Sequence, residues 1–89
     1  MSRVLAFDFG ASTGRAILAE YNGEKIEYNE IHRFDNVLCE QNGMLCWDFD
    51  YLLGEVKKAI SLAENADSLA FDTWGVDYVL LSGKKEMFP

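Results

Sequence analysis

The stretch that decides the fold is residues 3–21, RVLAFDFGASTGRAILAEY. Its first part, residues 3–9, is short and apolar and is followed by a glycine, which is typical of a strand buried on both faces. Residues 10–14 (GASTG) indicate a turn, and residues 15–21 (RAILAEY) indicate a second strand. This order predicts an antiparallel pair of strands joined by a glycine-rich turn.

A third strand is predicted to continue the sheet. Asn22-Gly23 is a strong two-residue hairpin signal, and residues 25–30 then alternate polar and apolar side chains. The alternation slips by one position at Ile31, before Phe34, which indicates a β-bulge or a fading edge strand. The first third of the chain is therefore predicted to be an antiparallel three-strand meander.

One amphipathic helix is predicted after an irregular polar stretch, residues 35–43, and a short extended piece, residues 44–47. Either Asp48 or Asp50 can cap this helix, and Asn65 is a reasonable stop. Its apolar residues recur at helical spacing, which predicts a single core-facing side. They are Leu52, Leu53, Val56, Ala59, Ile60 and Ala63.

Residues 68–72 (SLAFD) indicate a further buried strand, residues 76–81 are extended again, and residues 82–85 are typical of a hairpin tip. A helix that crosses the sheet and returns parallel to the first strand forms the right-handed connection that topology favours. The predicted class is α/β, with a three-strand meander, a crossover helix and a parallel fourth strand. This order resembles the opening part of the ribonuclease-H-like domain of actin-like ATPases.

The composition excludes several kinds of function. With 15 Asp and Glu against 8 Lys and Arg, the net charge of -7 argues against binding to nucleic acid or to an anionic membrane surface. No apolar run approaches the roughly 18–20 residues that span a bilayer, and the acid at position 8 comes too early for a signal peptide. Cys39 and Cys46 form no metal-binding motif, so we expect reduced cysteines in a cytoplasmic protein.

Residues 8–15 (DFGASTGR) form the first segment that can carry chemistry. Glycines allow the backbone to approach a bound group, so the turn can hold phosphate oxygens while Asp8 holds Mg²⁺ directly or through water. The segment lacks the Gly-Lys-Ser/Thr of a Walker A loop. An ordinary hairpin turn, with Asp8 capping a neighbouring backbone group, explains the same spacing.

Residues 71–78 (FDTWGVDY) form the second such segment, because ligands of α/β sheets lie beyond the carboxyl ends of the strands. Trp74 can stack on the apolar face of a sugar ring. The alternative places Trp74 in the core and uses Asp72 and Asp77 in turn hydrogen bonds. Since the first and fourth strands are predicted neighbours, Asp8 and this segment are expected to open on the same edge of the sheet.

Three weaker candidates have plainer explanations. His32 can serve as a general base, but it lies on a predicted edge strand where a structural histidine is expected. Asp48 and Asp50 are expected to be helix caps rather than an acid/base pair. Lys84 and Lys85 are expected to lie in a solvated turn.

The chain resembles the FGGY carbohydrate kinases. Residues 8–15 are similar to the phosphate-loop motif of that family. Residues 30–36 (EIHRFDN), 41–48 (QNGMLCWD) and 72–81 (DTWGVDYVLL) match, in order and spacing, the members that act on L-rhamnulose. The similarity runs through nearly the whole chain, and its most specific part is the DTWGVD stretch.

This resemblance implies ATP-dependent transfer of the γ-phosphate to the 1-hydroxyl of the sugar L-rhamnulose. It implies that Asp8 lies beside Mg²⁺ and that Gly75, with Trp74 and Asp77, lines the sugar pocket. The residues implied to contact the ATP phosphates are Ala11, Ser12, Thr13, Gly14 and Arg15. No residue of the chain matches the catalytic base of the family, so none is assigned that role.

The resemblance also implies that residues 1–89 are an incomplete N-terminal portion of the first domain of such a kinase. The base and the adenosine pocket would lie in the remainder of the kinase chain, and the 89 residues alone are expected to be inactive. Part of the apolar surface is then expected to be an exposed seam. Two alternatives stay open: a related kinase for xylulose or fuculose, and a small non-catalytic α/β binding module.

Overall fold

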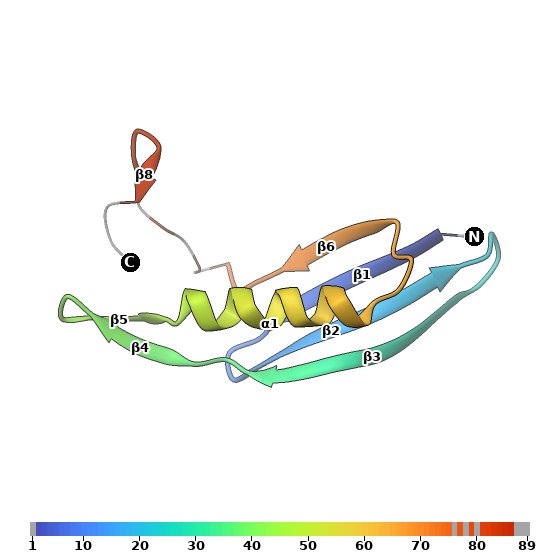
Figure 1. The fold of residues 1–89 in the computed structure, drawn as a ribbon, viewed down its shortest axis with the longest axis horizontal. Helices are drawn as coiled ribbons and strands as arrows, with labels where there is room; N and C mark the ends of the chain where they lie inside the picture. The colour runs from blue at the N-terminus through green and yellow to red at the C-terminus, as the bar shows by residue number, and fades with distance from the viewer. Residues whose placement is uncertain (1, 76, 78, 80, 87–89) are drawn as a thin grey trace.

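Four strands form one mixed sheet in the order β3-β2-β1-β6 (Figure 1). They are β1 (Ser2–Phe9), β2 (Thr13–Tyr21), β3 (Ile26–Asp35) and β6 (Ser68–Asp72). Strand β1 pairs antiparallel with β2 and parallel with β6, and β2 pairs antiparallel with β3. The computed structural model describes residues 2–75, 77, 79 and 81–86. The predicted meander and parallel fourth strand are confirmed.

Strand β3 contains the bulge that the sequence predicts. The register pairs Ala16 with His32 and Ile17 with Glu30, so Ile31 is the extra residue. An extra residue shifts the alternation of side chains between the two faces by one position. That shift explains why the polar and apolar pattern slips at Ile31, and it directs Phe34 into the core, where it is buried.

Helix α1 (Phe49–Leu62) lies across one face of the sheet and runs antiparallel to β1 and β6 (Figure 1). Of the two predicted caps, Asp48 and not Asp50 is the N-cap of α1, because its carboxylate accepts a hydrogen bond from the main-chain N–H of Tyr51 at 3.1 Å. The helix ends close to the predicted stop, and Asn65, at a φ of 60°, lies just beyond it.

The core is small and lies between α1 and the centre of the sheet. Its buried cluster consists of Leu5, Phe7, Ala16, Val56 and Ala59. The apolar stripe predicted for the helix is therefore only partly used. Leu53 and Ile60 remain 37% and 41% exposed.

Strand β6 is not the buried strand that the sequence predicts. All its residues are exposed, and Phe71 is 55% exposed even though its ring stacks on Phe7 at a centroid distance of 4.9 Å. The cause is the placement of α1, which packs on β1, β2 and β3 and leaves β6 uncovered within the described part of the chain. Likewise, β1 is fully buried only on its helix side, at Leu5 and Phe7.

Two small hairpins lie outside the main sheet. Strands β4 (Leu38–Gln41) and β5 (Met44–Trp47) pair around Asn42 and Gly43, which have φ angles of 54° and 76°. Two successive positive φ angles are typical of the type I′ turn of a β-hairpin. Residues 35–43, which the sequence predicts to be irregular, therefore contain the strand β4. Strands β7 (Leu81–Ser82) and β8 (Lys85–Glu86) flank the predicted hairpin tip. The extension predicted for residues 76–81 lies partly outside the described residues.

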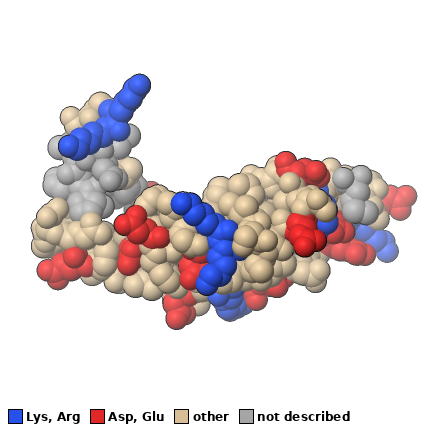
Figure 2. Space-filling view, in the orientation of Figure 1, with Lys and Arg blue, Asp and Glu red and all other residues tan. Residues whose placement is uncertain are grey.

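The described residues include no helix with the length and hydropathy to cross a membrane. On the face drawn in Figure 2, basic side chains do not gather into a broad patch, and acidic side chains are spread along the molecule.

Gly14 is buried in β2 because the ring of Phe34 lies across it. The two residues are register partners on neighbouring strands, and a Cβ atom at Gly14 would overlap atoms of the Phe34 ring. Gly54 provides the opposite case, since a Cβ atom on this exposed residue of α1 would have nothing within 4 Å. The sheet therefore gives Gly14 a steric role that is independent of any ligand.

Replacing Gly14 with Ala should lower the free energy of unfolding by about 1–3 kcal/mol, because the new methyl group must displace the Phe34 ring. The matched control Gly54→Ala should raise it by up to about 1 kcal/mol through helix propensity. Urea unfolding followed by circular dichroism measures both changes. Equal stability of Gly14→Ala and the unsubstituted protein would show that Phe34 is not held across this position.

Candidate functional site

The carboxyl ends of β1 and β6 meet at one edge of the sheet. The two strands run in parallel, and Asp8 at the end of β1 is the register partner of Asp72 at the end of β6. The glycine-rich turn that joins β1 to β2 leaves from this edge (Figure 1), and Thr73, Trp74 and Gly75 follow β6. The structure thus brings together the two segments that the sequence singles out.

A row of charged residues crosses the sheet at this edge. In register, Asp72 lies beside Asp8, Asp8 beside Arg15, and Arg15 beside Arg33. Because Phe7 points into the core under α1, Asp8 and its partners lie on the opposite face. Sequence reasoning did not find this row, because it depends on the register of four strands.

Asp8 and Arg15 form an ion pair within this row. Arg15 Nη2 lies 2.7 Å from Asp8 Oδ2, and both side chains are partly exposed. The hydrogen bond to Asp8, together with its negative charge, raises the pKa of Arg15. The residue predicted to contact phosphate thus pairs here with the residue predicted to lie beside the metal.

The glycine-rich turn is closed by hydrogen bonds. The main-chain N–H of Gly10 donates to the carbonyl of Thr13 at 2.9 Å, and the side-chain amide of Asn36 donates to the carbonyl of Gly10 at 2.7 Å. Ala11 and Ser12 are exposed at the tip, and their N–H groups donate to no main-chain carbonyl in the described part of the chain. Free N–H groups in a tight turn can bind anionic oxygens.

Asn36 is a residue of this site that sequence reasoning missed. Its main-chain N–H donates to the carbonyl of Ser12 at 2.9 Å, so both its backbone and its side chain hold the glycine-rich turn. Its Oδ1 atom is buried and has no hydrogen-bond partner among the described residues. The only signal in the sequence was its place at the end of the 30–36 stretch.

The segment after β6 folds back on itself. The N–H of Asp77 donates to the carbonyl of Trp74 at 3.0 Å, and the N–H of Trp74 donates to Asp77 Oδ2 at 3.1 Å. The prediction of turn hydrogen bonds for Asp77 is therefore confirmed. The placement of Trp74 in the core is wrong, because its side chain is 48% exposed.

The weaker candidates have structural roles. His32 Nε2 lies 2.5 Å from Glu55 Oε2, and both side chains are largely buried, so this pair joins β3 to α1.

Cys39 and Cys46 are register partners with free thiols, and burial raises the pKa of Cys46. Among the described residues, no group of three His, Cys, Asp or Glu side chains lies together in a way that could hold a metal ion.

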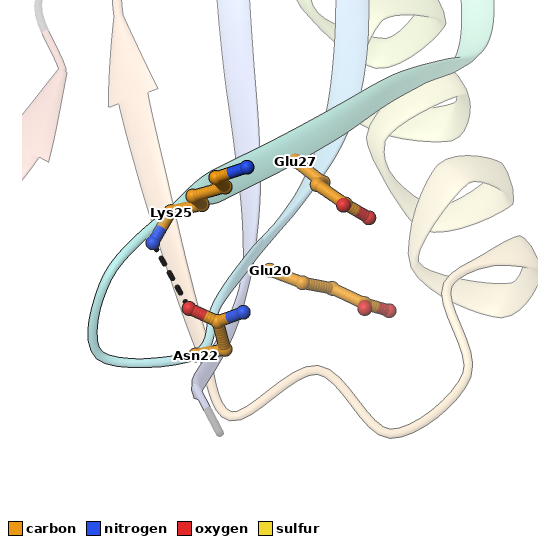
Figure 3. Close-up of a pocket in the computed structure, with 4 residues that line it drawn as sticks. All are labelled: Glu20, Asn22, Lys25 and Glu27. Atoms are coloured by element: carbon orange, nitrogen blue, oxygen red, sulfur yellow. Dashed lines mark hydrogen bonds between the residues drawn. The ribbon is translucent and has the colours of Figure 1, made fainter.

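A shallow depression lies at the hairpin between β2 and β3, at the opposite end of these strands from the glycine-rich turn. It is lined by Glu20, Asn22, Lys25 and Glu27 (Figure 3). Asn22 Oδ1 accepts the main-chain N–H of Lys25 at 2.9 Å, which is an ordinary stabilisation of a hairpin turn. The depression has no connection to the candidate site.

These features describe a candidate ligand site. An α/β sheet with two register-paired Asp residues and two exposed turns at its carboxyl edge can accept a ligand at the ends of the strands. Exposed turn N–H groups favour an anionic ligand, and an exposed Trp favours a ring.

The chain is similar to rhamnulokinases of several bacteria. It is 47% identical to the enzyme of Halalkalibacterium halodurans over 85 residues and 46% identical to that of Mannheimia succiniciproducens over 90 residues. These alignments cover 91% and 94% of the chain but only 18% and 19% of the two relatives. The rhamnulokinase of Klebsiella pneumoniae is 46% identical over 83 residues. No family model matches the chain.

The chain is therefore homologous to part of the rhamnulokinases, which are sugar kinases, and it spans less than a fifth of the length of these curated relatives. The resemblance inferred from the motifs is confirmed at this level.

The pair formed by His32 and Glu55 predicts a pH dependence of stability. The hydrogen bond from His32 is the largest cause that lowers the pKa of Glu55. The ordinary pKa of a Glu side chain is about 4.3. As the pH falls below that value, the unfolded state takes up a proton at Glu55 before the folded state does. The stability that Glu55 contributes is present above its unfolded pKa and is lost as the pH falls through its lowered folded pKa.

Glu55→Gln should lower the free energy of unfolding at neutral pH by about 1–2 kcal/mol, because a charge-assisted hydrogen bond is lost. As the pH falls below about 4.3 and through the lowered folded pKa of Glu55, the difference from the unsubstituted protein should shrink, because Glu55 then becomes protonated in the folded state as well. Urea unfolding across this range tests both expectations, with the exposed Glu64→Gln as a control. Parallel stability curves for Glu55→Gln and the unsubstituted protein would contradict them.

Proposed function

We propose that this chain is part of the first domain of an ATP-dependent kinase that phosphorylates L-rhamnulose at its 1-hydroxyl. The observation that carries the proposal is the meeting of the glycine-rich turn and the Trp74–Gly75 turn at one edge of the sheet. It occurs in a chain 46–47% identical to rhamnulokinases over nine-tenths of its length. The proposal gives the sheet a ribonuclease-H-like topology, which its strand order supports.

The glycine-rich turn is the proposed site of the ATP phosphates. The exposed N–H groups of Ala11 and Ser12 can donate to phosphate oxygens, and Arg15 supplies a positive charge beside them. Thr13 adds a hydroxyl, and Gly14 keeps the turn close to the sheet. The ion pair with Asp8 holds Arg15 at this edge before ATP binds.

The donor atoms at this edge fit Mg²⁺, which prefers carboxylate and water oxygens. Asp8, with Asp72 as its register partner, would hold the ion directly or through water. When bound, Mg²⁺ would neutralise charge on the transferred phosphate. Arg15 offsets the charge of Asp8 until then.

The turn that follows β6 is the proposed sugar site. A Cβ atom at Gly75 would have nothing within 4 Å, so a ligand can approach the main chain there. The exposed ring of Trp74 can cover the apolar face of a sugar. Asp77 holds the turn that contains Trp74 and Gly75 through its hydrogen bond with the N–H of Trp74.

In this proposal the catalytic base and the adenosine pocket are supplied by the remainder of the kinase chain. The exposed hydrophobic side chains of β6, Leu69 and Phe71, support further packing on that side of the sheet. A reaction that uses metabolic ATP places the proposed kinase in the cytoplasm. Residues 1–89 alone would then bind ATP weakly at best and transfer no phosphate.

A kinase that contains this chain should phosphorylate L-rhamnulose with a higher kcat/KM than xylulose or fuculose. A coupled assay that detects ADP measures all three sugars, with residues 1–89 alone as the inactive control. Preference for another ketose would assign the chain to a related kinase. Absence of any turnover would favour a non-catalytic binding module, and turnover by residues 1–89 alone would overturn the division of roles proposed above.

Asp8→Asn in the same kinase should lower kcat at least about hundredfold, because a neutral amide is a poor ligand for Mg²⁺ and its phosphate complex. The control is Asp50→Asn, on the exposed first turn of α1, which should keep its activity. An unchanged kcat for Asp8→Asn, measured across a range of Mg²⁺ concentrations, would remove Asp8 from the metal site.

A further inference from the structure

We infer that Asp77 is a positioning residue whose carboxylate ties the Trp74–Gly75 turn to Trp47 and so fixes the sugar-binding edge. The kinetic consequence of this link rests on the proposed function, whereas the link itself does not. The inference differs from the role of sugar contact implied by the resemblance.

Both carboxylate oxygens of Asp77 are engaged within the protein. Oδ1 accepts the indole N–H of Trp47 at 2.9 Å, and Oδ2 accepts the main-chain N–H of Trp74 at 3.1 Å. The N–H of Asp77 returns a bond to the carbonyl of Trp74 at 3.0 Å. Hydrogen bonds to an ionised carboxylate are stronger than neutral ones, so this is a firm connection between residues 30 positions apart.

Trp47 is well suited to be the fixed end of this link. It is the last residue of β5 and directly precedes Asp48, the N-cap of α1. The N–H of Asp48 donates to the carbonyl of Val37 at 2.8 Å, which closes the base of the β4–β5 hairpin. Trp47 is partly buried, and its place in the chain, between the β4–β5 hairpin and α1, fixes its backbone at both ends.

Within the described part of the chain, residues outside the turn give it little other support. It follows β6, whose residues are all exposed, and Thr73, Trp74 and Gly75 are exposed as well. Such a turn loses conformational freedom only through the contacts that hold it. The bonds through Asp77 therefore decide where Trp74 and Gly75 stand relative to the strand ends that carry Asp8.

Loss of the link should affect the sugar and spare ATP, because the glycine-rich turn is held separately through Asn36. Asp77→Asn keeps the shape of the side chain and removes its charge, whereas Trp47→Phe keeps a smaller aromatic ring and removes the indole N–H donor. In the complete kinase, each should raise the KM for the sugar about tenfold and leave the KM for ATP unchanged. The double variant should be no worse than Asp77→Asn alone, because that substitution already weakens the bond to Trp47 as well as the bond to the N–H of Trp74.

The matched controls are Asp50→Asn and Tyr28→Phe, two exposed residues away from the link, which should leave both KM values unchanged. A silent Trp47→Phe beside an impaired Asp77→Asn would overturn the inference in favour of direct sugar contact. Additive effects in the double variant would overturn it too. Equal rises in the KM values for sugar and ATP would show a general structural role instead.

The link is also measurable without any substrate. The ¹⁵N–¹H signal of the Trp47 indole should shift in Asp77→Asn, because its acceptor changes from a carboxylate to an amide. An unchanged signal would overturn the inference whatever the kinetics show. If the unsubstituted kinase transfers phosphate to none of the sugars, the proposed function fails, and the indole signal still decides whether Asp77 binds Trp47.

Discussion

The parallel pairing of β1 with β6 is the constraint on which the rest of the structure depends. Five register pairs, from Val4–Ser68 to Asp8–Asp72, set the two strands in the same direction. Parallel neighbours require a crossover, so α1 must return across the sheet, and its face becomes the core. The same pairing places both strand ends, and the turns that follow them, at one edge.

This pairing also creates an electrostatic conflict. Asp8 and Asp72 are neighbours of like charge on one face of the sheet, an arrangement that destabilises a pair of strands. Arg15 offsets part of the cost through its ion pair with Asp8. Residues that break a local rule of stability are typical of functional sites, and a cation at this edge would resolve the conflict.

Local patterns in the sequence predict most of the fold. The alternation of side chains located the bulge at Ile31. The Asn22-Gly23 signal located the hairpin, although residues 22–25 connect its strands and not the predicted two. The β4–β5 hairpin was missed although Asn42-Gly43 carries the same signal, because the flanking residues show no clear alternation. The exposure of β6 could not be predicted, since burial depends on what packs over a strand as well as on its own residues.

The sequence was sufficient to predict which segments form the candidate site, but not which side chains within them are in contact. Both segments were found from their composition, and the parallel pairing explained why they meet. The charged row and the bond between Asp77 and Trp47 join residues whose proximity depends on register and on the path of a hairpin. The resemblance rested on residues 41–48 and 72–81, which contain Trp47 and Asp77, but it did not show that these two side chains are in contact.

The glycines of the phosphate-loop motif show how far such a motif can be trusted as evidence of function. Gly14 is required beneath the ring of Phe34, and a Cβ atom at Gly10 would lie 3.0 Å from the carbonyl oxygen of Thr13. Packing alone therefore explains both glycines. The exposed tip at Ala11 and Ser12, and the pairing of Asp8 with Asp72 in the register of β1 and β6, have no such explanation. The case for a nucleotide site consequently rests on these residues and not on the glycines that make the motif conspicuous.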